Sequence, residues 1–116
     1  MKALAAACVL ALAAAPACAA GFGRDLFDAQ CAACHTLTGH STLSGPSLKG
    51  VVWRKIADLS DFKYTASLKA QVGTWSPDRL DAYLRNTQKF APGTDMFWDI
   101  KDASKRKAII EFLAQQ

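Results

Sequence analysis

The sequence predicts an all-α domain with three or four helices that are joined by two long loops. Apolar residues recur at steps of three and four in separate segments, which is the period of one helix face, and no alternating strand pattern of useful length appears. The chain has 116 residues, enough for one domain. Because so few helices bury only a modest core, we expect a further component to fill the centre of the domain.

The first predicted helix runs from Gly21 to Ala33, and a long loop follows from Thr36 to Tyr64. The helix is indicated by apolar residues on one face, namely Phe22, Leu26, Phe27, Ala29 and Ala33. The loop has no sustained period and contains Gly39, Gly45, Pro46 and Gly50. A loop of that length is uncommon in a compact domain unless it serves a function. One or two helical turns are expected between Thr65 and Val72.

A further helix is predicted to begin at Ser76-Pro77-Asp78 and to end near Asn86. Its start combines a capping hydroxyl, a proline at the first helical position and an acid beside the positive end of the helix dipole. A second loop is expected from Thr87 to Lys101. Asp102 or Ser104 then caps a last helix, whose apolar face holds Ala108, Ile109, Phe112 and Leu113.

Residues 1–19 have the pattern of a secretory signal peptide, with Lys2 before an apolar region and Ala17-Cys18-Ala19 as a small-x-small cleavage site. The apolar run is too short for a good membrane-spanning helix. We therefore expect an exported protein, periplasmic if the source is bacterial, whose mature domain covers residues 20–116 and has no stable membrane insertion. Lipid attachment at Cys18 is an alternative, disfavoured because Ala15 stands where a large aliphatic residue is usual.

Charge and cysteine content exclude two further classes. The formal net charge is +4, and the sequence has no basic tract or stripe of the kind that binds nucleic acid. Cys8 and Cys18 fall in the predicted signal, so the mature chain keeps Cys31 and Cys34. A disulfide between them would close a very small loop and remove little chain entropy, so a structural disulfide is not expected.

Cys31-Ala32-Ala33-Cys34-His35 is a C-x-x-C-H sequence, the attachment signature of c-type heme. Two cysteine sulfurs one helical turn apart can form thioethers with two vinyl groups of the porphyrin, and the next residue places an imidazole beneath the iron. A thioredoxin-like motif would require a βαβ context, which is absent. A zinc site normally has four protein ligands, and His40 is the only other cysteine or histidine of the mature chain.

Other residues form a second pattern. Gly23 and Phe27 lie in the first predicted helix and Phe112 in the last; Gly45–Gly50 reads Gly-Pro-Ser-Leu-Lys-Gly, and Pro92–Met96 reads Pro-Gly-Thr-Asp-Met. With the C-x-x-C-H motif, these residues resemble the monoheme class I cytochromes c, the mitochondrial-type and bacterial soluble proteins of that family. The resemblance covers Gly23 to Leu113. It implies a small cytochrome c fold, in which helices and long loops wrap around one covalently attached heme.

The resemblance also implies the axial ligands of the heme iron. His35 is the proximal ligand, and the Pro46 carbonyl accepts the other N–H of its imidazole, which fixes the tautomer and ring orientation. Met96, the only methionine outside the predicted signal, is the sixth ligand, and His/Met ligation raises the reduction potential. His40 is the rival, although a tether of five residues from His35 would have to pass round the heme edge.

Arg54, Tyr64 and Trp75 stand where the family has groups that bind a heme propionate, and Tyr83 where it has a tyrosine near the sixth ligand. Phe97 and Trp98, beside Met96, are expected to shield the heme from water. The sequence departs from the family pattern at several positions: Trp53, Leu68, Thr87-Gln88, Asp95 and Asp99.

Two functions follow from these residues. The first is a one-electron carrier, not an enzyme, because a six-coordinate iron leaves no open position for substrate. The second is a ligand-binding sensor or a weakly peroxidatic heme protein in which Met96 dissociates. The carrier is favoured, since no distal His/Arg pair appears near Met96. Its partners would be a redox protein donor and acceptor, such as a dehydrogenase, a cytochrome complex or a terminal oxidase of a respiratory chain, and the protein itself would be a monomer.

Overall fold

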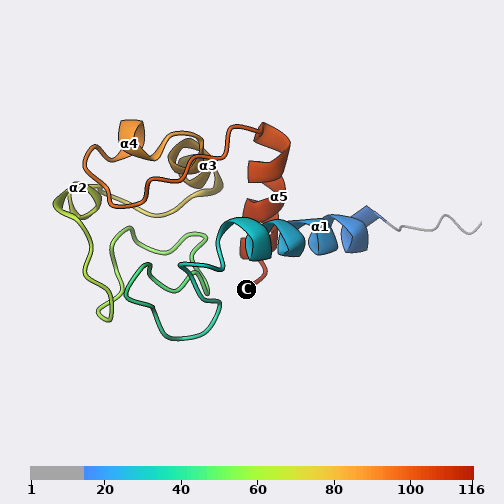
Figure 1. Cartoon of the computed structure of the whole chain (residues 1–116), viewed down its shortest axis with the longest axis horizontal. Helices are drawn as coiled ribbons and strands as arrows, with labels where there is room; N and C mark the ends of the chain where they lie inside the picture. Colours follow the sequence, from blue (N-terminus) through green and yellow to red (C-terminus); the bar gives the residue numbers. More distant parts are fainter. Residues whose placement is uncertain (1–14) are drawn as a thin grey trace, which may run out of the picture.

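The computed structural model describes residues 15–116, with side chains from residue 21 onward, and confirms the all-α class. Helix α1 crosses α5 on one side of the domain. Helices α3 and α4 and the loop of residues 36–64 lie at opposite ends of the rest of the domain (Figure 1). In the described part of the chain, Lys55 and Thr74 form an isolated β-bridge. The helices are α1 (Ala15–Gln30), α2 (Ala66–Lys69), α3 (Pro77–Arg85), α4 (Thr87–Phe90) and α5 (Ala103–Leu113).

The described residues therefore contain five helices where the sequence predicted three or four. The additional helix is α4, which begins where the second loop was expected. It is too short to show a hydrophobic period, and polar contacts define it. The Asn86 side chain accepts a hydrogen bond from the Lys89 amide at 3.0 Å, and Asp99 Oδ1 accepts one from the Thr87 amide at 2.9 Å.

The boundaries of α1 also differ from those predicted. The helix begins at Ala15, inside the predicted signal, and ends at Gln30 instead of Ala33. Residues 31–34 form a turn in which the amides of Cys34 and His35 both donate to the Cys31 carbonyl, at 3.1 and 3.0 Å. The heme-attachment motif thus follows the helix directly. Residues 1–14 of the predicted signal lie outside the described part of the chain.

Helices α1 and α5 approach each other closely at Gly23. A Cβ added there would lie 2.5 Å from the Ala108 carbonyl oxygen and 2.7 Å from the Phe112 Cβ, so only glycine permits this crossing. One turn further on, the rings of Phe27 and Phe112 pack with their centroids 5.7 Å apart. The crossing brings the end of α1, and with it the C-x-x-C-H motif, against the core of the domain.

Local capping begins the two longer C-terminal helices as predicted. Ser76 Oγ accepts a hydrogen bond from the Arg79 amide at 3.2 Å at the start of α3. At the start of α5 the cap is Asp102, whose Oδ1 accepts from the amides of Ser104 and Lys105 at 2.9 and 3.2 Å. Each of these caps satisfies amides that would otherwise lack a partner.

A buried arginine joins α5 to α3 and to the segment between them. Arg106 is 5% exposed, and its Nε donates to Asp81 Oδ1 at 2.7 Å. Its Nη1 donates to the carbonyls of Ile100 and Lys101, both at 2.9 Å. The guanidinium therefore holds the end of the predicted second loop against the two helices.

The long loop of residues 36–64 is fastened to the chain that precedes α3. The Trp75 amide donates to the Arg54 carbonyl at 2.7 Å, and the Trp53 amide donates to the Trp75 carbonyl at 2.8 Å. Within the loop, Asp61 accepts hydrogen bonds from the Ser41 amide and hydroxyl at 2.8 and 2.7 Å. These contacts make the loop one side of an enclosed space at the centre of the domain.

Candidate functional site

A cavity of about 440 Å³ lies at the centre of the domain, between the long loop, α3, α5 and the segment that contains Met96. Much of its lining is aliphatic or aromatic, as in Leu48, Val51, Leu68, Leu80, Leu84, Ile109 and Leu113. The structure brings all nine predicted site residues to this cavity: Cys31, Cys34, His35, Pro46, Arg54, Tyr64, Trp75, Tyr83 and Met96. His40, the rival ligand, is exposed and is not part of the lining.

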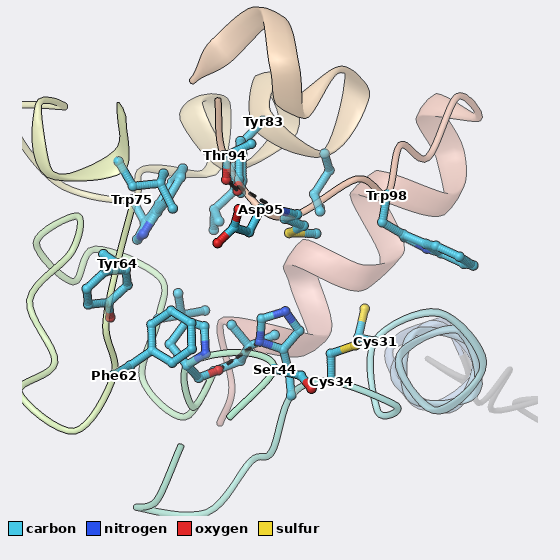
Figure 2. Close-up of a pocket in the computed structure, with 18 of the residues that line it drawn as sticks. Cys31, Cys34, Ser44, Phe62, Tyr64, Trp75, Tyr83, Thr94, Asp95 and Trp98 are labelled. Carbon is cyan, nitrogen blue, oxygen red and sulfur yellow. Dashed lines mark hydrogen bonds between the residues drawn. The ribbon is translucent and has the colours of Figure 1, made fainter. Parts of the chain in front are cut away.

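The two cysteines lie at one edge of the cavity, away from Tyr64 and Trp75 (Figure 2). Both thiols are free; Cys31 is buried and Cys34 is exposed. Burial raises the pKa of Cys31 to about 11, so this thiol is protonated at neutral pH before attachment. In the part of the chain described here, no group of three or more His, Cys, Asp or Glu side chains is placed to hold a metal ion.

The imidazole of His35 is oriented by a single backbone acceptor. Its Nδ1 lies 2.7 Å from the Pro46 carbonyl oxygen. A carbonyl can only accept, so Nδ1 carries the hydrogen and Nε2 keeps its lone pair for a metal. Burial lowers the pKa of His35, which favours the neutral ring that can act as a ligand.

Gly45 makes this orientation possible, a role that the sequence did not reveal. A Cβ at this position would lie 2.7 Å from both Cε1 and Nδ1 of His35, and 2.9 Å from the Cys34 carbonyl oxygen. The imidazole therefore packs directly on the glycine backbone. The glycine stood out in the sequence only as part of the Gly45–Gly50 loop.

The segment that contains Met96 is held to α3 by a buried pair of hydroxyls. Tyr83 Oη and Thr94 Oγ1 are 2.8 Å apart and face each other at the cavity (Figure 2). Burial raises the pKa of Tyr83, so the phenol stays protonated and can donate to Thr94 at neutral pH. Met96 itself is half-buried and packs against the core cluster.

Gln88 and Asp99 also hold this segment, although in the sequence they stand out only as departures from the family pattern. Gln88 Nε2 donates to the Thr94 carbonyl at 2.8 Å, and its Oε1 accepts from the Gly93 amide at 3.1 Å. Asp99 Oδ1 accepts from both the amide and the hydroxyl of Thr87, at 2.9 and 3.2 Å. These partners are distant enough in sequence that no local pattern reveals them.

Polar groups gather on the side of the cavity away from the cysteines. Arg54 Nη1 and Nη2 donate to the carbonyls of Lys49 and Ser47 at 3.1 and 2.8 Å, while its Nε is buried without a hydrogen-bond partner. Tyr64 and Trp75 lie beside the cavity at this side (Figure 2). A buried donor left unpaired costs about 1–3 kcal/mol, which a bound carboxylate would relieve. The site therefore fits an apolar group that carries acidic side chains.

These features define a class of protein. Two free cysteines and an oriented imidazole stand at one edge of an apolar cavity, a thioether comes from a separate segment, and the half-buried Arg54 has a buried Nε without a hydrogen-bond partner. Each feature suits one part of a heme: thiols can react with vinyl groups, an imidazole and a thioether can bind iron, the apolar lining suits the ring, and the unpaired donor suits a propionate. The fold and the site are those of a small c-type heme protein.

Comparisons with known proteins agree with this class. Residues 22–116 match the family model of cytochrome c. The chain is 39% identical over 92 residues to the cytochrome c-type cyt cy of Rhodobacter capsulatus, covering 78% of this chain and 46% of that protein. It is 42% identical over 89 residues to cytochrome c of Tetrahymena pyriformis, covering 77% of this chain and 80% of that protein.

The similarity extends to solved structures. Cytochrome cH from Methylobacterium extorquens superposes with a TM-score of 0.77 at 33% identity, covering 84% of this chain and 98% of that chain. The chain belongs to the cytochrome c family. Members of this family carry one covalently bound c-type heme and transfer electrons, so the predicted fold and cofactor are confirmed.

Proposed function

We propose that this protein is a one-electron carrier whose heme iron is bound by His35 and Met96, and that it has no enzymatic activity of its own. The observation that carries the proposal is the convergence of Cys31, Cys34, His35 and Met96 on one cavity. The heme, when bound, supplies an iron that alternates between the ferrous and ferric states. The protein supplies its attachment, its ligands and its surroundings.

The two proposed iron ligands, His35 and Met96, have distinct tasks. His35 presents Nε2 because its Nδ1–H is held by the Pro46 carbonyl at 2.7 Å, and this bond makes the imidazole a stronger ligand. Met96 supplies a soft thioether, which favours ferrous iron and raises the reduction potential. The Tyr83–Thr94 pair and Gln88 hold the Met96 segment in place through hydrogen bonds to Thr94.

The remaining residues of the cavity control charge and water. Arg54, Tyr64 and Trp75 would hold the propionates and compensate the cost of burying carboxylates. The aliphatic lining excludes water, and fixed surroundings change little when the iron changes charge. A site that needs little rearrangement suits repeated electron transfer better than substrate turnover.

The alternative is a sensor or weakly peroxidatic protein in which Met96 leaves the iron. Among the described residues that line the cavity, His35 is the single histidine, and it would be occupied as the proximal ligand. Arg54 already donates to two backbone carbonyls. The cavity therefore offers no second imidazole to serve as a distal base, which favours the carrier.

Binding of carbon monoxide separates the two functions. The ferrous protein at neutral pH and without denaturant should bind no carbon monoxide on mixing, because Met96 occupies the sixth position. The Met96→Ala variant is the matched control and should bind it readily. Rapid and complete binding by the unsubstituted protein would contradict the carrier and favour the sensor.

We further propose that residues 1–19 direct export and are removed, so that a monomer of residues 20–116 works in the periplasm of a bacterial source. In the described residues no helix is both long enough and apolar enough to cross a membrane. The partners would be a redox protein donor and acceptor of a respiratory chain. The intact mass of the protein purified from the periplasmic fraction tests this: it should equal residues 20–116 plus one heme, whereas a diacylglycerol on Cys18 would add lipid mass.

A further inference from the structure

One hydrogen bond joins two segments at the edge of the heme cavity. We call this edge, between Gln30 and Trp98, the mouth of the cavity. Trp98 Nε1 donates to Gln30 Oε1 at 3.0 Å, although the two residues are 68 positions apart. Gln30 is the last residue of α1 and directly precedes Cys31, while Trp98 follows Met96 by two positions. Both side chains line the cavity. Figure 2 shows Trp98 on the same side of the cavity as α1 and Cys31.

The other side-chain hydrogen bonds of residues 91–99 do not cross the mouth. Thr94 is bound by Tyr83 and Gln88, and Asp99 is bound by Thr87, so these contacts all go to α3 and α4. Within the described residues, the Trp98–Gln30 bond is the only side-chain hydrogen bond that joins this segment to α1. It therefore connects the segment to the end of α1, which directly precedes the cysteines of the heme-attachment motif.

Packing holds this part of the segment only weakly. The Phe97 side chain is 77% exposed and Trp98 is 51% exposed, so little apolar surface is buried at the two positions after Met96. Further along, the Ile100 amide donates to the Leu84 carbonyl at 2.7 Å, and Arg106 holds the Ile100 carbonyl. The segment is thus fixed from Ile100 onward, and the Trp98–Gln30 bond is the side-chain hydrogen bond that restrains the two exposed positions after Met96.

We propose that Trp98 and Gln30 are positioning residues that act as a latch and set how often Met96 leaves the heme iron. This inference rests on the proposed His35/Met96 ligation. The bond between them restrains the segment without touching the iron. Its loss would raise the rate at which the sixth position opens, while the closed state and its spectrum remain the same.

Entry of an external ligand measures this opening. Oxidised holo protein is mixed with cyanide at rising concentrations, and the rate reaches a limit set by dissociation of Met96. Trp98→Phe keeps the aromatic ring and removes the donor, and Gln30→Met keeps the length of the side chain and removes the acceptor. Each should raise the limiting rate about two- to tenfold, the effect expected for one hydrogen bond.

The double variant and a matched tryptophan give the controls. If the two side chains act through their mutual bond, Trp98→Phe with Gln30→Met should be no faster than the faster single variant. Trp53→Phe makes the same chemical change at a tryptophan that is 66% exposed and does not line the cavity, and it should leave the limiting rate unchanged.

The outcomes separate the latch from the ligation. If the unsubstituted oxidised protein has no sulfur–iron charge-transfer band, or Met96→Ala leaves its spectrum unchanged, the ligation fails and the latch with it. If the band is present in all variants but Trp98→Phe and Gln30→Met open at the original rate, the ligation stands and the latch is refuted. Fully additive effects in the double variant would also refute it.

Discussion

Substitution of Gly45 by alanine should displace the imidazole of His35 and destabilise the heme-bound protein. The added Cβ would lie 2.7 Å from two atoms of the His35 ring, against a lower limit of 3.4 Å for ordinary contact. The ring would therefore have to retreat by roughly 0.7 Å, the difference between these two distances. The Cys34 carbonyl oxygen lies 2.9 Å from the same Cβ, so the Cβ cannot shift toward Cys34 to avoid the ring.

Neither neighbour is free to move away. The His35 ring is held by the Pro46 carbonyl at 2.7 Å, and the Cys34 carbonyl accepts a hydrogen bond from Thr42 Oγ1 at 2.6 Å. Overpacking at such a site costs about 1–3 kcal/mol. Weakening the hydrogen bond between His35 and the Pro46 carbonyl adds a further cost of up to about 1 kcal/mol. We expect the free energy of unfolding to fall by about 2–3 kcal/mol.

Guanidinium unfolding of the heme-bound protein, followed by heme absorbance, measures this loss. With a denaturant slope of about 2–6 kcal/mol/M, the midpoint should fall by roughly 0.3–1.5 M. Gly39→Ala is the matched control, because it lies in the same loop and has no atom within 4 Å of its added Cβ. Its stability should change by less than about 0.5 kcal/mol. Equal midpoints for the two variants would refute the steric argument at His35.

Three further predictions concern the heme and its partners. Cys31→Ala should sharply reduce the yield of protein with covalent heme, because one of two thioethers is lost; intact mass spectrometry checks this, and an undiminished yield would contradict the role. Met96→Ala should abolish the sulfur–iron band and lower the reduction potential, as redox titration would detect, because the soft ligand of ferrous iron is gone. Electron transfer with the native partner should depend weakly on salt, because Asp95 and Asp99 put negative charge on both sides of Met96 in the sequence and offset the small positive charge of the chain; a tenfold or larger fall in the second-order rate constant between about 10 and 150 mM salt would contradict this.

The heme site could be predicted from the sequence where its chemistry depends on covalent spacing. Cys31, Cys34 and His35 lie within five consecutive positions, so their joint use requires only one local turn. The caps at Ser76 and Asp102 could be predicted for the same reason, since each side chain binds an amide two or three residues ahead. The Pro92–Met96 segment carried enough of a known pattern to place a thioether among the site residues, while its ligation to iron remains a proposal.

Contacts between residues that are six or more positions apart were decided only by the tertiary structure. Gly45 against His35, Gln88 against Thr94, Asp99 against Thr87 and Trp98 against Gln30 depend on which segments meet around the cavity, and no periodicity reports that. Helix α4 could not be predicted because its four residues are too few to show a period. Its first amide, that of Thr87, donates to the carboxylate of Asp99, which is twelve positions away. Local spacing specifies which atoms can bind the heme. The packing of loops that are far apart in the chain determines how firmly those atoms are held, because hydrogen bonds and steric contacts form wherever the folded chain brings the groups together.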